Sequence, residues 1–324
     1  MPYIKDNLPY NVPYQIYIDP SNLCNFKCNF CPTGNTKLMK NIQRPAGMMK
    51  MTTFKKFIDD LNLMVKKYKK KPSMIALFKD GEPLLNPNLP DMIRLINECN
   101  LSEKLHITSN GSLMNNFLSN KLIESGLNEI RFSIYGVDDG SYKTNVNKNI
   151  EYEKVKKNIS EFWSVNKSYG YPVKVICKLM DIYSNKQIER FKNQFSDICN
   201  TLIIEKFHKW SDSENWDIKG KQKKIDDMEK DFICAQPFSR LTVLFNGDVT
   251  PCCVDWSHKL VVGNINSESL DHIWNSLCNK IRHQHIKKSF HEDSPCIKCD
   301  YKSKRTKYDK IYNQNNYLNK IYSC

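Results

Sequence analysis

Strand-like and helix-like segments alternate along the first 207 residues, and this alternation restricts the chain to few folds. In segment 53–69 apolar residues recur at helical spacing, whereas 74–78 is a short, continuous apolar run typical of a buried strand. The predicted strands cover 14–20, 74–78, 105–108, 129–135, 173–180 and 201–207, and the predicted helices 53–69, 91–99, 115–125, 152–167 and 185–195. Six such units predict an α/β fold with a parallel sheet wrapped by helices.

The length and the hydrophobic content allow a large core. With 324 residues, 40% of them hydrophobic, the chain suits one large domain and a smaller one. The first residues lack an apolar signal core, and no stretch approaches a membrane-spanning length. A cytoplasmic location and no membrane partner are therefore expected.

The 13 cysteines indicate metal binding, because the cytosol keeps ordinary thiols reduced. Three that stand singly among apolar neighbours, Cys99, Cys177 and Cys199, are expected to be small buried hydrophobic residues.

The formal net charge of +14 favours acidic partners, such as phosphorylated or nucleotide-linked substrates, or nucleic acid. It is equally consistent with solubility and a bias toward lysine. The basic runs 66–71 and 302–320 are expected to be solvated faces, and no nucleic-acid-binding motif accompanies them. Nucleic acid is therefore not the expected partner.

Three cysteines, Cys24, Cys28 and Cys31, directly follow the first predicted strand. Three thiolates hold three corners of a four-iron cluster and leave the fourth iron for a small chelating ligand. A structural zinc site is the alternative, but zinc sites usually recur as CxxC pairs with four ligands close by. The spacing, with Phe30 before the last thiol, resembles the cluster motif of radical S-adenosylmethionine (SAM) enzymes.

This resemblance implies a partial (β/α)6 TIM-like barrel over residues 1–207, with a [4Fe-4S] cluster and SAM at the carboxyl ends of the strands. The second strand ends in a run that resembles the GGEP motif, which grips the amino group of SAM; its members are Asp80, Gly81, Glu82 and Pro83. Asp80 replaces the first glycine of that motif. An ordinary Gly-Pro turn is the alternative interpretation.

Polar residues at the next strands match places where the family contacts SAM. Ser109 and Asn110 end the third strand, and Ser133 lies on the fourth. Their small hydroxyl and amide groups suit the hydroxyls of a ribose, although a Ser-Asn-Gly turn is also simply a good turn. The basic residue for the SAM carboxylate is either Lys143 or Lys178 on the fifth strand.

A second cysteine pattern begins after a polar linker, residues 208–230, and fills the segment 231–301, ahead of a basic tail, 302–324. Its cysteines are Cys234, Cys252, Cys296 and Cys299, and the residues 245–248 between the first two predict a hairpin turn. The spacing resembles a SPASM domain in the shortened twitch form of a radical SAM aminocyclitol (2-deoxy-scyllo-inosamine) dehydrogenase. A zinc ribbon is the alternative.

Four thiolates imply one fully ligated auxiliary [4Fe-4S] cluster that accepts electrons. Cys253 is an alternative to Cys252 as the ligand. Cys253 and Cys278 are also candidate hydrogen donors, as a radical epimerase would need, or else buried, inert thiols.

The resemblance implies reductive cleavage of SAM to a 5′-deoxyadenosyl radical, which abstracts hydrogen from the substrate. An external donor such as flavodoxin or ferredoxin would supply the electron. For a sugar or cyclitol, loss of a hydrogen atom, a proton and an electron gives a ketone. Glu205, Lys206 and His208, after the sixth strand, are candidate bases.

Two other functions remain open. One is a radical SAM epimerase or a ribosomal-peptide-modifying enzyme, although a leader-peptide-binding domain is not evident before the first strand. The other is a non-catalytic iron–sulfur or zinc scaffold that binds nucleic acid, against which the motif of Gly81, Glu82 and Pro83 argues.

Overall fold

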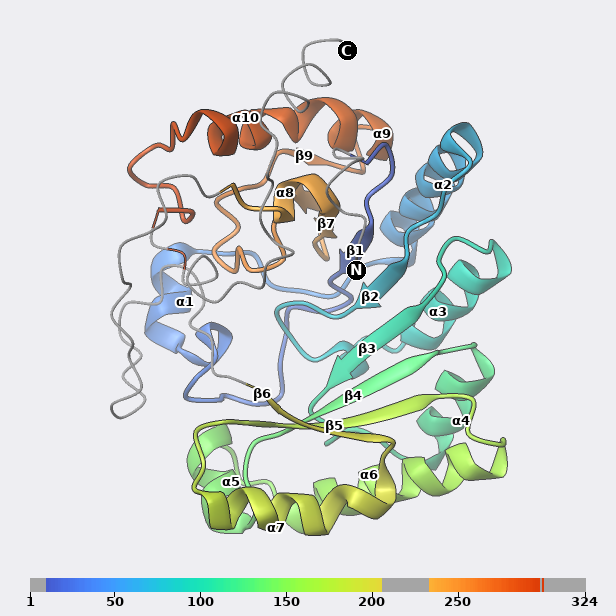
Figure 1. Cartoon of the computed structure of the whole chain (residues 1–324), viewed down its shortest axis with the longest axis vertical. Helices are drawn as coiled ribbons and strands as arrows, with labels where there is room; N and C mark the ends of the chain where they lie inside the picture. Colours follow the sequence, from blue (N-terminus) through green and yellow to red (C-terminus); the bar gives the residue numbers. More distant parts are fainter. Residues whose placement is uncertain (1–9, 206–232, 298, 300–324) are drawn as a thin grey trace.

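The computed structural model describes residues 10–205, 233–297 and 299. Six parallel strands with helices between them form its larger part (Figure 1). The strands are β1 (Gln15–Ile18), β2 (Met74–Leu77), β3 (Leu105–Ser109), β4 (Glu129–Ile134), β5 (Lys174–Met180) and β6 (Thr201–Glu205). The α/β fold with a parallel sheet, predicted from the alternation of segments, is confirmed.

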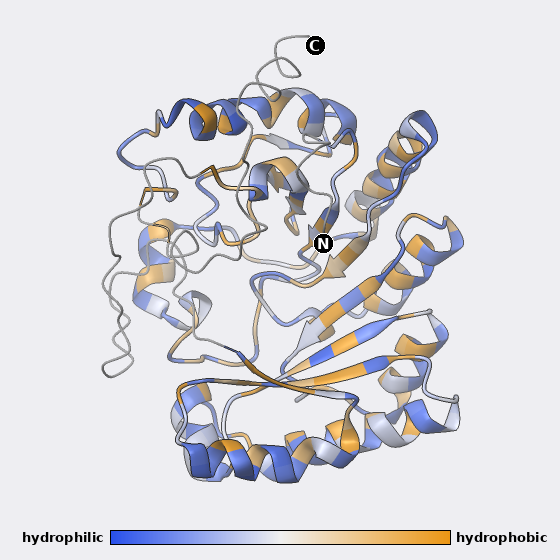
Figure 2. Cartoon of the chain, in the orientation of Figure 1, coloured by the Kyte–Doolittle hydropathy of each residue, from blue (hydrophilic) through white to orange (hydrophobic). Residues whose placement is uncertain are grey.

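Each predicted helix of this part exists, with ends shifted by at most a few residues. The helices are α2 (Met51–Tyr68), α3 (Leu89–Glu98), α4 (Asn116–Glu124), α6 (Tyr152–Ser168) and α7 (Asn185–Phe195). In α2 the side chains of Phe54, Phe57 and Leu61 are fully buried, which is the result expected from their helical spacing. Figure 2 shows the apolar residues along the central strands and in stripes along the helices that cover them.

Two helices of this part, α1 (Thr36–Ile42) and α5 (Asp139–Val146), were not predicted. Helix α1 has no buried residue, and its seven residues are too short a window for a helical period to stand out in the sequence. Helix α5 begins with a capping box in which Asp138 and Ser141 exchange side-chain and backbone hydrogen bonds. That cap was the available sequence signal.

The C-terminal part continues the barrel sheet. Strand β7 (Arg240–Val243) pairs with β1 in parallel, and β8 (Asp248–Thr250) and β9 (Gly263–Asn264) follow antiparallel, so the order is β6-β5-β4-β3-β2-β1-β7-β8-β9. The predicted hairpin turn is confirmed between β7 and β8, where Gly247 has a φ of +91°. Because β1 lies between β2 and β7, the two cysteine-bearing parts share one sheet.

The C-terminal helices pack on this extension through buried contacts. They are α8 (Gln236–Ser239), α9 (Leu270–His272), the π-helical turn η4 (Ile273–Leu277) and α10 (Asn279–Lys287). Short 3-10 turns occur at η1 (Pro32–Gly34), η2 (Pro83–Leu85) and η3 (Ser196–Ile198). Arg282 of α10 is buried, lies 4.2 Å from the Trp274 ring and donates from Nε to the Pro237 carbonyl at 2.9 Å.

Among the residues that the structure describes, none of the helices combines the length and the apolar character of a membrane span. Of the three single cysteines, Cys177 and Cys199 are buried as expected. The expectation for Cys99 is wrong, because this residue follows the last turn of α3 and its side chain is exposed. The linker 208–230 and the tail 302–324 lie outside the described residues.

Candidate metal centres and active site

The first cysteine loop leaves the carboxyl end of β1 and brings three thiols together. Cys28 is buried, and Cys24 and Cys31 are half-buried. Burial raises the pKa of the Cys28 thiol well above its usual value, and the nearby Cys31 and Cys24 raise it further. Burial also raises the pKa of Cys24 to about 12. The raised pKa values of Cys24 and Cys28 suit a bound metal, which stabilises the thiolate form.

Two glycines allow the close backbone approaches that shape this loop. A Cβ atom on Gly34 would lie 2.3 Å from the Cys28 carbonyl oxygen, and one on Gly81 would lie 2.2 Å from the Leu23 carbonyl oxygen. Beside Gly81, the Glu82 amide donates to the same Leu23 carbonyl at 2.8 Å. The cysteine loop therefore rests directly on the carboxyl end of β2.

Glu82 connects the ends of β2 and β3. Its side chain is buried. The carboxylate accepts hydrogen bonds from Ser109 Oγ at 2.8 Å, from the backbone amide of Asn110 at 2.8 Å and from the backbone amide of Leu84 at 3.1 Å. Burial raises the pKa of Glu82 to about 7, because its effect exceeds that of these hydrogen bonds, which lower the pKa. Asn110 Nδ2 in turn donates to Asn25 Oδ1 in the cysteine loop at 2.9 Å.

Of the other predicted SAM-binding residues, Ser133 is buried on β4 and Pro83 opens η2. The structure thus gathers Gly81, Glu82, Ser109 and Asn110 beside the first cysteine loop.

Asp80 carries a role that a glycine in its place could not have. Its carboxylate lies 2.6 Å from Lys79 Nζ, 3.1 Å from Arg44 Nη1 and 2.7 Å from His258 Nε2. Although burial alone would raise the pKa of Asp80, Lys79, His258 and Arg44 hold it well below its usual range. Arg44 also donates to the Trp256 carbonyl at 2.5 Å. This buried network joins the β2 motif to the loop 255–258 of the C-terminal part.

Asp19, the residue after β1, was not predicted as a site residue. It is fully buried, and among the described residues its carboxylate has no side-chain hydrogen-bond partner. Burial and the neighbouring Asp80 raise its pKa to about 7, against the opposing pull of Lys79 and Arg44. Its position at the carboxyl end of a barrel strand was the available signal.

Lys178, a candidate to bind the SAM carboxylate, and Glu205, a candidate base, pair with each other near the ends of β5 and β6. Lys178 Nζ lies 2.8 Å from Glu205 Oε2, and both side chains are partly exposed. Lys143, the competing candidate for the SAM carboxylate, is exposed on α5. The candidate bases Lys206 and His208 lie outside the described residues.

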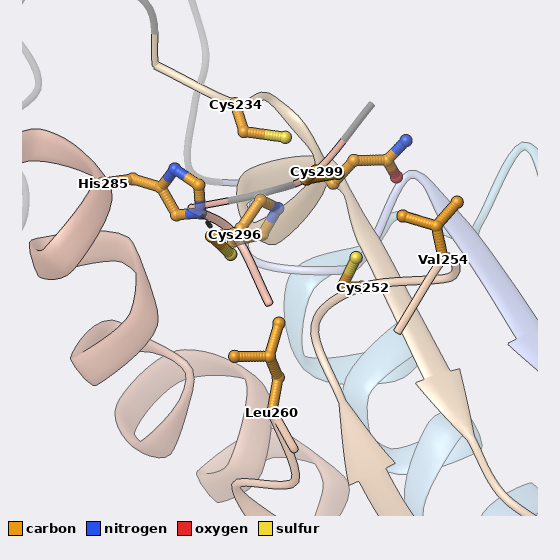
Figure 3. A pocket seen from close by; sticks show the side chains of 9 residues that line it. Cys234, Cys252, Val254, Leu260, His285, Cys296 and Cys299 are labelled. Carbon is orange, nitrogen blue, oxygen red and sulfur yellow. Dashed lines mark hydrogen bonds between the residues drawn. The ribbon is translucent and has the colours of Figure 1, made fainter. Parts of the chain in front are cut away.

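The second centre is a pocket between α8, β8 and α10 that four cysteines line (Figure 3). Its lining residues are Cys234, Gln236, Pro237, Cys252, Val254, Leu260, His285, Cys296 and Cys299. Cys234 precedes α8, Cys252 follows β8, and the last two cysteines follow α10. All four predicted auxiliary cysteines are thus brought together.

Cys253 and Cys278 lie in other surroundings. The Cys253 thiol does not line the pocket and instead donates to Gln236 Oε1 at 3.6 Å. Cys278 is fully buried in the hydrophobic core, and burial raises its pKa to about 11. Cys278 therefore has the surroundings of an inert, buried thiol.

The arrangement of the cysteines fits clusters. Within residues 10–205, 233–297 and 299, no three His, Cys, Asp or Glu side chains converge tightly enough to bind one metal ion. In a four-iron cluster each thiolate binds a different iron, so the sulfurs surround the group instead of converging on a point. Four thiols around a pocket with Pro237, Val254 and Leu260 match that requirement.

A partial parallel barrel with one cysteine centre at its strand ends, followed by a second cysteine centre, defines an iron–sulfur protein that uses SAM. The chain belongs to the radical SAM superfamily, whose family model matches residues 18–193, and the iron–sulfur cluster-binding SPASM domain matches residues 234–300. Its cofactors are accordingly a [4Fe-4S] cluster, SAM and an auxiliary iron–sulfur cluster.

Curated relatives include GTP 3′,8-cyclases. The protein of Staphylococcus epidermidis is 26% identical over 201 residues, which cover 56% of this chain and 54% of that one. A Staphylococcus aureus cyclase is 23% identical over 205 residues, with 61% and 58% covered. The chain thus spans little more than half the length of these relatives.

Solved structures share the fold over most of the chain. Streptococcus suis SuiB bound to SAM has a TM-score of 0.64, 15% identity and coverage of 90% of this chain and 72% of that one. The structure of anSMEcpe with bound SAM has a TM-score of 0.61, 17% identity and coverage of 96% of this chain and 95% of that one. BtrN in complex with SAM and 2-DOIA has a TM-score of 0.52, 17% identity and coverage of 85% and 89%.

Proposed function

We propose that this radical SAM enzyme oxidises a hydroxyl-bearing carbon of a sugar or cyclitol-type substrate to a ketone. The observation that carries the proposal is the set of four cysteines around one pocket in the C-terminal part. Four thiolates complete the ligand shell of a four-iron cluster, which leaves no iron for a substrate and suits electron acceptance. A dehydrogenase needs such an acceptor.

In this proposal Cys24, Cys28 and Cys31 hold three corners of the catalytic cluster. Glu82 receives the ammonium group of SAM, while Ser109, Asn110 and Ser133 border its ribose. The bound cofactors supply a 5′-deoxyadenosyl radical, which takes hydrogen from an unactivated carbon, and an electron acceptor. The buried Glu82 network supports this assignment, because it fixes the ends of β2 and β3 against the cysteine loop.

Glu205, at the end of β6 and 2.8 Å from Lys178, is proposed as the acceptor of the hydroxyl proton. The substrate then loses one hydrogen atom from carbon, one proton from oxygen and one electron. The product is a ketone two hydrogens lighter than the alcohol. An external flavodoxin or ferredoxin is the proposed source of the electron that starts each cleavage of SAM.

Peptide modification is the second candidate. The titles of two matching structures name bound peptides: the precursor peptide SuiA with SuiB, and the Cp18Cys peptide with anSMEcpe. For an epimerisation, in contrast to a dehydrogenation, Cys253 is the proposed hydrogen donor. Its position beside Gln236, next to the auxiliary pocket, supports that assignment.

The first experiment uses the full chain, reconstituted with iron and sulfide under anaerobic conditions, reduced with dithionite and supplied with SAM. The expected result is about eight irons per chain and formation of 5′-deoxyadenosine. A variant with Cys24, Cys28 and Cys31 all replaced by alanine should keep the auxiliary cluster and form no nucleoside. Zinc in place of iron would contradict the proposal.

A panel of sugars, aminocyclitols, nucleotide-linked sugars, GTP and peptides then separates the candidate reactions by product mass. Loss of two hydrogens from an alcohol supports the dehydrogenase. An unchanged mass with deuterium taken up from heavy water supports an epimerase instead, and a modified peptide supports the second candidate. Cleavage of SAM that only GTP stimulates would favour the reaction of the curated relatives.

A further inference from the structure

His285 is a buried imidazole in the auxiliary pocket that the four-cysteine pattern does not include. It lies on α10, is 3% exposed, and its Nε2 lies 3.6 Å from the sulfur of Cys296. In Figure 3 its ring points toward Cys296 and away from the helix axis. Because sulfur is a larger atom than oxygen, this is a hydrogen-bonding distance for a sulfur atom and a nitrogen.

Packing of the Phe290 ring and of helix α10 fixes the imidazole in this place. The ring of Phe290 packs edge-on against it, with ring centroids 4.8 Å apart. One turn earlier on α10, Arg282 donates to the Pro237 carbonyl and stacks on Trp274, which anchors the helix to α8. Pro237 itself lines the pocket. The imidazole is therefore held against Cys296 by the packing of α10.

The direction of this hydrogen bond follows from the chemistry of the ligand. A cysteine sulfur that binds iron has lost its proton, so it only accepts hydrogen bonds. The proton must then reside on Nε2 of His285. Hydrogen bonds to cluster sulfurs stabilise the more negative, reduced state, and they are one of the factors that set cluster potentials. The apolar neighbours Val254 and Leu260 exclude competing water and strengthen the effect.

We propose that His285 donates an N–H···S hydrogen bond to Cys296 and thereby raises the reduction potential of the auxiliary cluster. This inference rests on the proposed function, in which Cys296 ligates that cluster and the cluster receives one electron from the substrate. A higher potential favours that transfer. His285 is a positioning and tuning residue in this proposal, since it acts on the cluster through Cys296.

The test measures the auxiliary cluster alone, in the full chain with Cys24, Cys28 and Cys31 replaced by alanine. In this parent, the midpoint potential is followed by electron paramagnetic resonance during a mediated reductive titration. His285→Leu removes the donor at similar size, and His285→Gln keeps an N–H donor. His272→Leu, at an exposed position on α9, is the control.

The expected result is a more negative midpoint potential in His285→Leu, a potential close to the parent in His285→Gln, and no shift in the control. Equal potentials in the parent and His285→Leu, at equal iron content, would overturn the inference. So would equal shifts in the Leu and Gln variants, which would show a packing role only. Failure of the parent to bind four irons contradicts the proposed function itself and is seen before any histidine is changed.

A measurement on the unmutated parent covers the case in which His285→Leu fails to load. With ¹⁵N-labelled histidine, pulsed electron paramagnetic resonance of the reduced cluster should show a weak nitrogen coupling together with an exchangeable proton. Absence of both signals overturns the inference. A strong nitrogen coupling also overturns it, because it would mean that His285 binds iron directly.

Discussion

Nε2 of His258 lies 2.7 Å from Oδ2 of Asp80, although the two residues are 178 positions apart in the chain. Asp80 belongs to the motif proposed to bind SAM, and His258 to the loop after β8. The same carboxylate also pairs with Lys79 and Arg44. One buried aspartate therefore connects the catalytic part of the barrel to the part that carries the auxiliary pocket.

Asp80→Asn should destabilise the protein by about 3–5 kcal/mol, because it removes the carboxylate that pairs with both buried cations, Lys79 and Arg44. The measurement is the thermal unfolding temperature of the reconstituted protein under anaerobic conditions. Asp91→Asn is the matched control, because Asp91 pairs with Arg94 on the surface and its loss should cost less than about 1 kcal/mol. Equal shifts in the two variants would contradict the importance of the network.

Asp19→Asn should stabilise the protein, and the gain should depend on pH. The pKa of Asp19 is raised from 3.8 to about 7, so its folded state favours the neutral form. In the parent, the contribution of Asp19 to the free energy of unfolding is fully present below pH 3.8, where the carboxyl group is protonated in both the folded and the unfolded state. That contribution is lost as the pH rises from 3.8 through the folded-state pKa of about 7.

Because the amide that replaces the carboxyl group stays neutral at every pH, the variant's advantage should be small near pH 4, grow up to about pH 7 and level off above it. A gain on the order of 4 kcal/mol at pH 8 corresponds to a pKa raised from 3.8 to about 7. Unfolding temperatures of both proteins at about pH 5, 6, 7 and 8 check this. A gain that does not change with pH would show that ionisation of Asp19 is not its cause.

Gly81→Ala should impair assembly of the first cluster, because the new Cβ would lie 2.2 Å from the Leu23 carbonyl oxygen. To relieve that contact the backbone beside Cys24 must shift, which displaces the cysteine loop. Gly140→Ala is the control, since the nearest atom there is 3.7 Å away. Iron content should fall toward that of the auxiliary cluster alone in Gly81→Ala and stay at the parental level in Gly140→Ala. A full iron load in both would refute the prediction.

Cys252→Ala and Cys253→Ala form a pair that differs by one position in the chain. Cys252 lines the auxiliary pocket, whereas the thiol of Cys253 contacts Gln236. We expect Cys252→Ala to lose the fully ligated auxiliary cluster and Cys253→Ala to retain it. Iron analysis and electron paramagnetic resonance of the reduced proteins distinguish the two. Loss of the cluster in Cys253→Ala alone would reverse the assignment.

The six strands of the barrel were predictable because each is a short segment that is rich in β-branched, aliphatic or aromatic residues, either continuous or alternating with polar ones, and β1 and β2 each precede a recognisable motif. The sequence also predicted that three polar residues at strand ends, Glu82, Ser109 and Asn110, lie side by side, because the carboxyl ends of parallel strands meet at one edge of a sheet. The pairing of β7 with β1 did not follow, because 240–243 contains no signal that selects its partner strand.

By itself, the sequence determined the fold class, the two cysteine patterns and the family to which they belong. These properties depend on residues close together in the chain, whose spacing sets helix or strand and places thiols in one loop. Only the tertiary structure decided that Cys252, and not Cys253, faces the pocket, that His285 contacts Cys296, and that Asp80 meets Arg44 and His258. The reason is physical: these contacts join segments distant in sequence, and packing of the whole chain selects them.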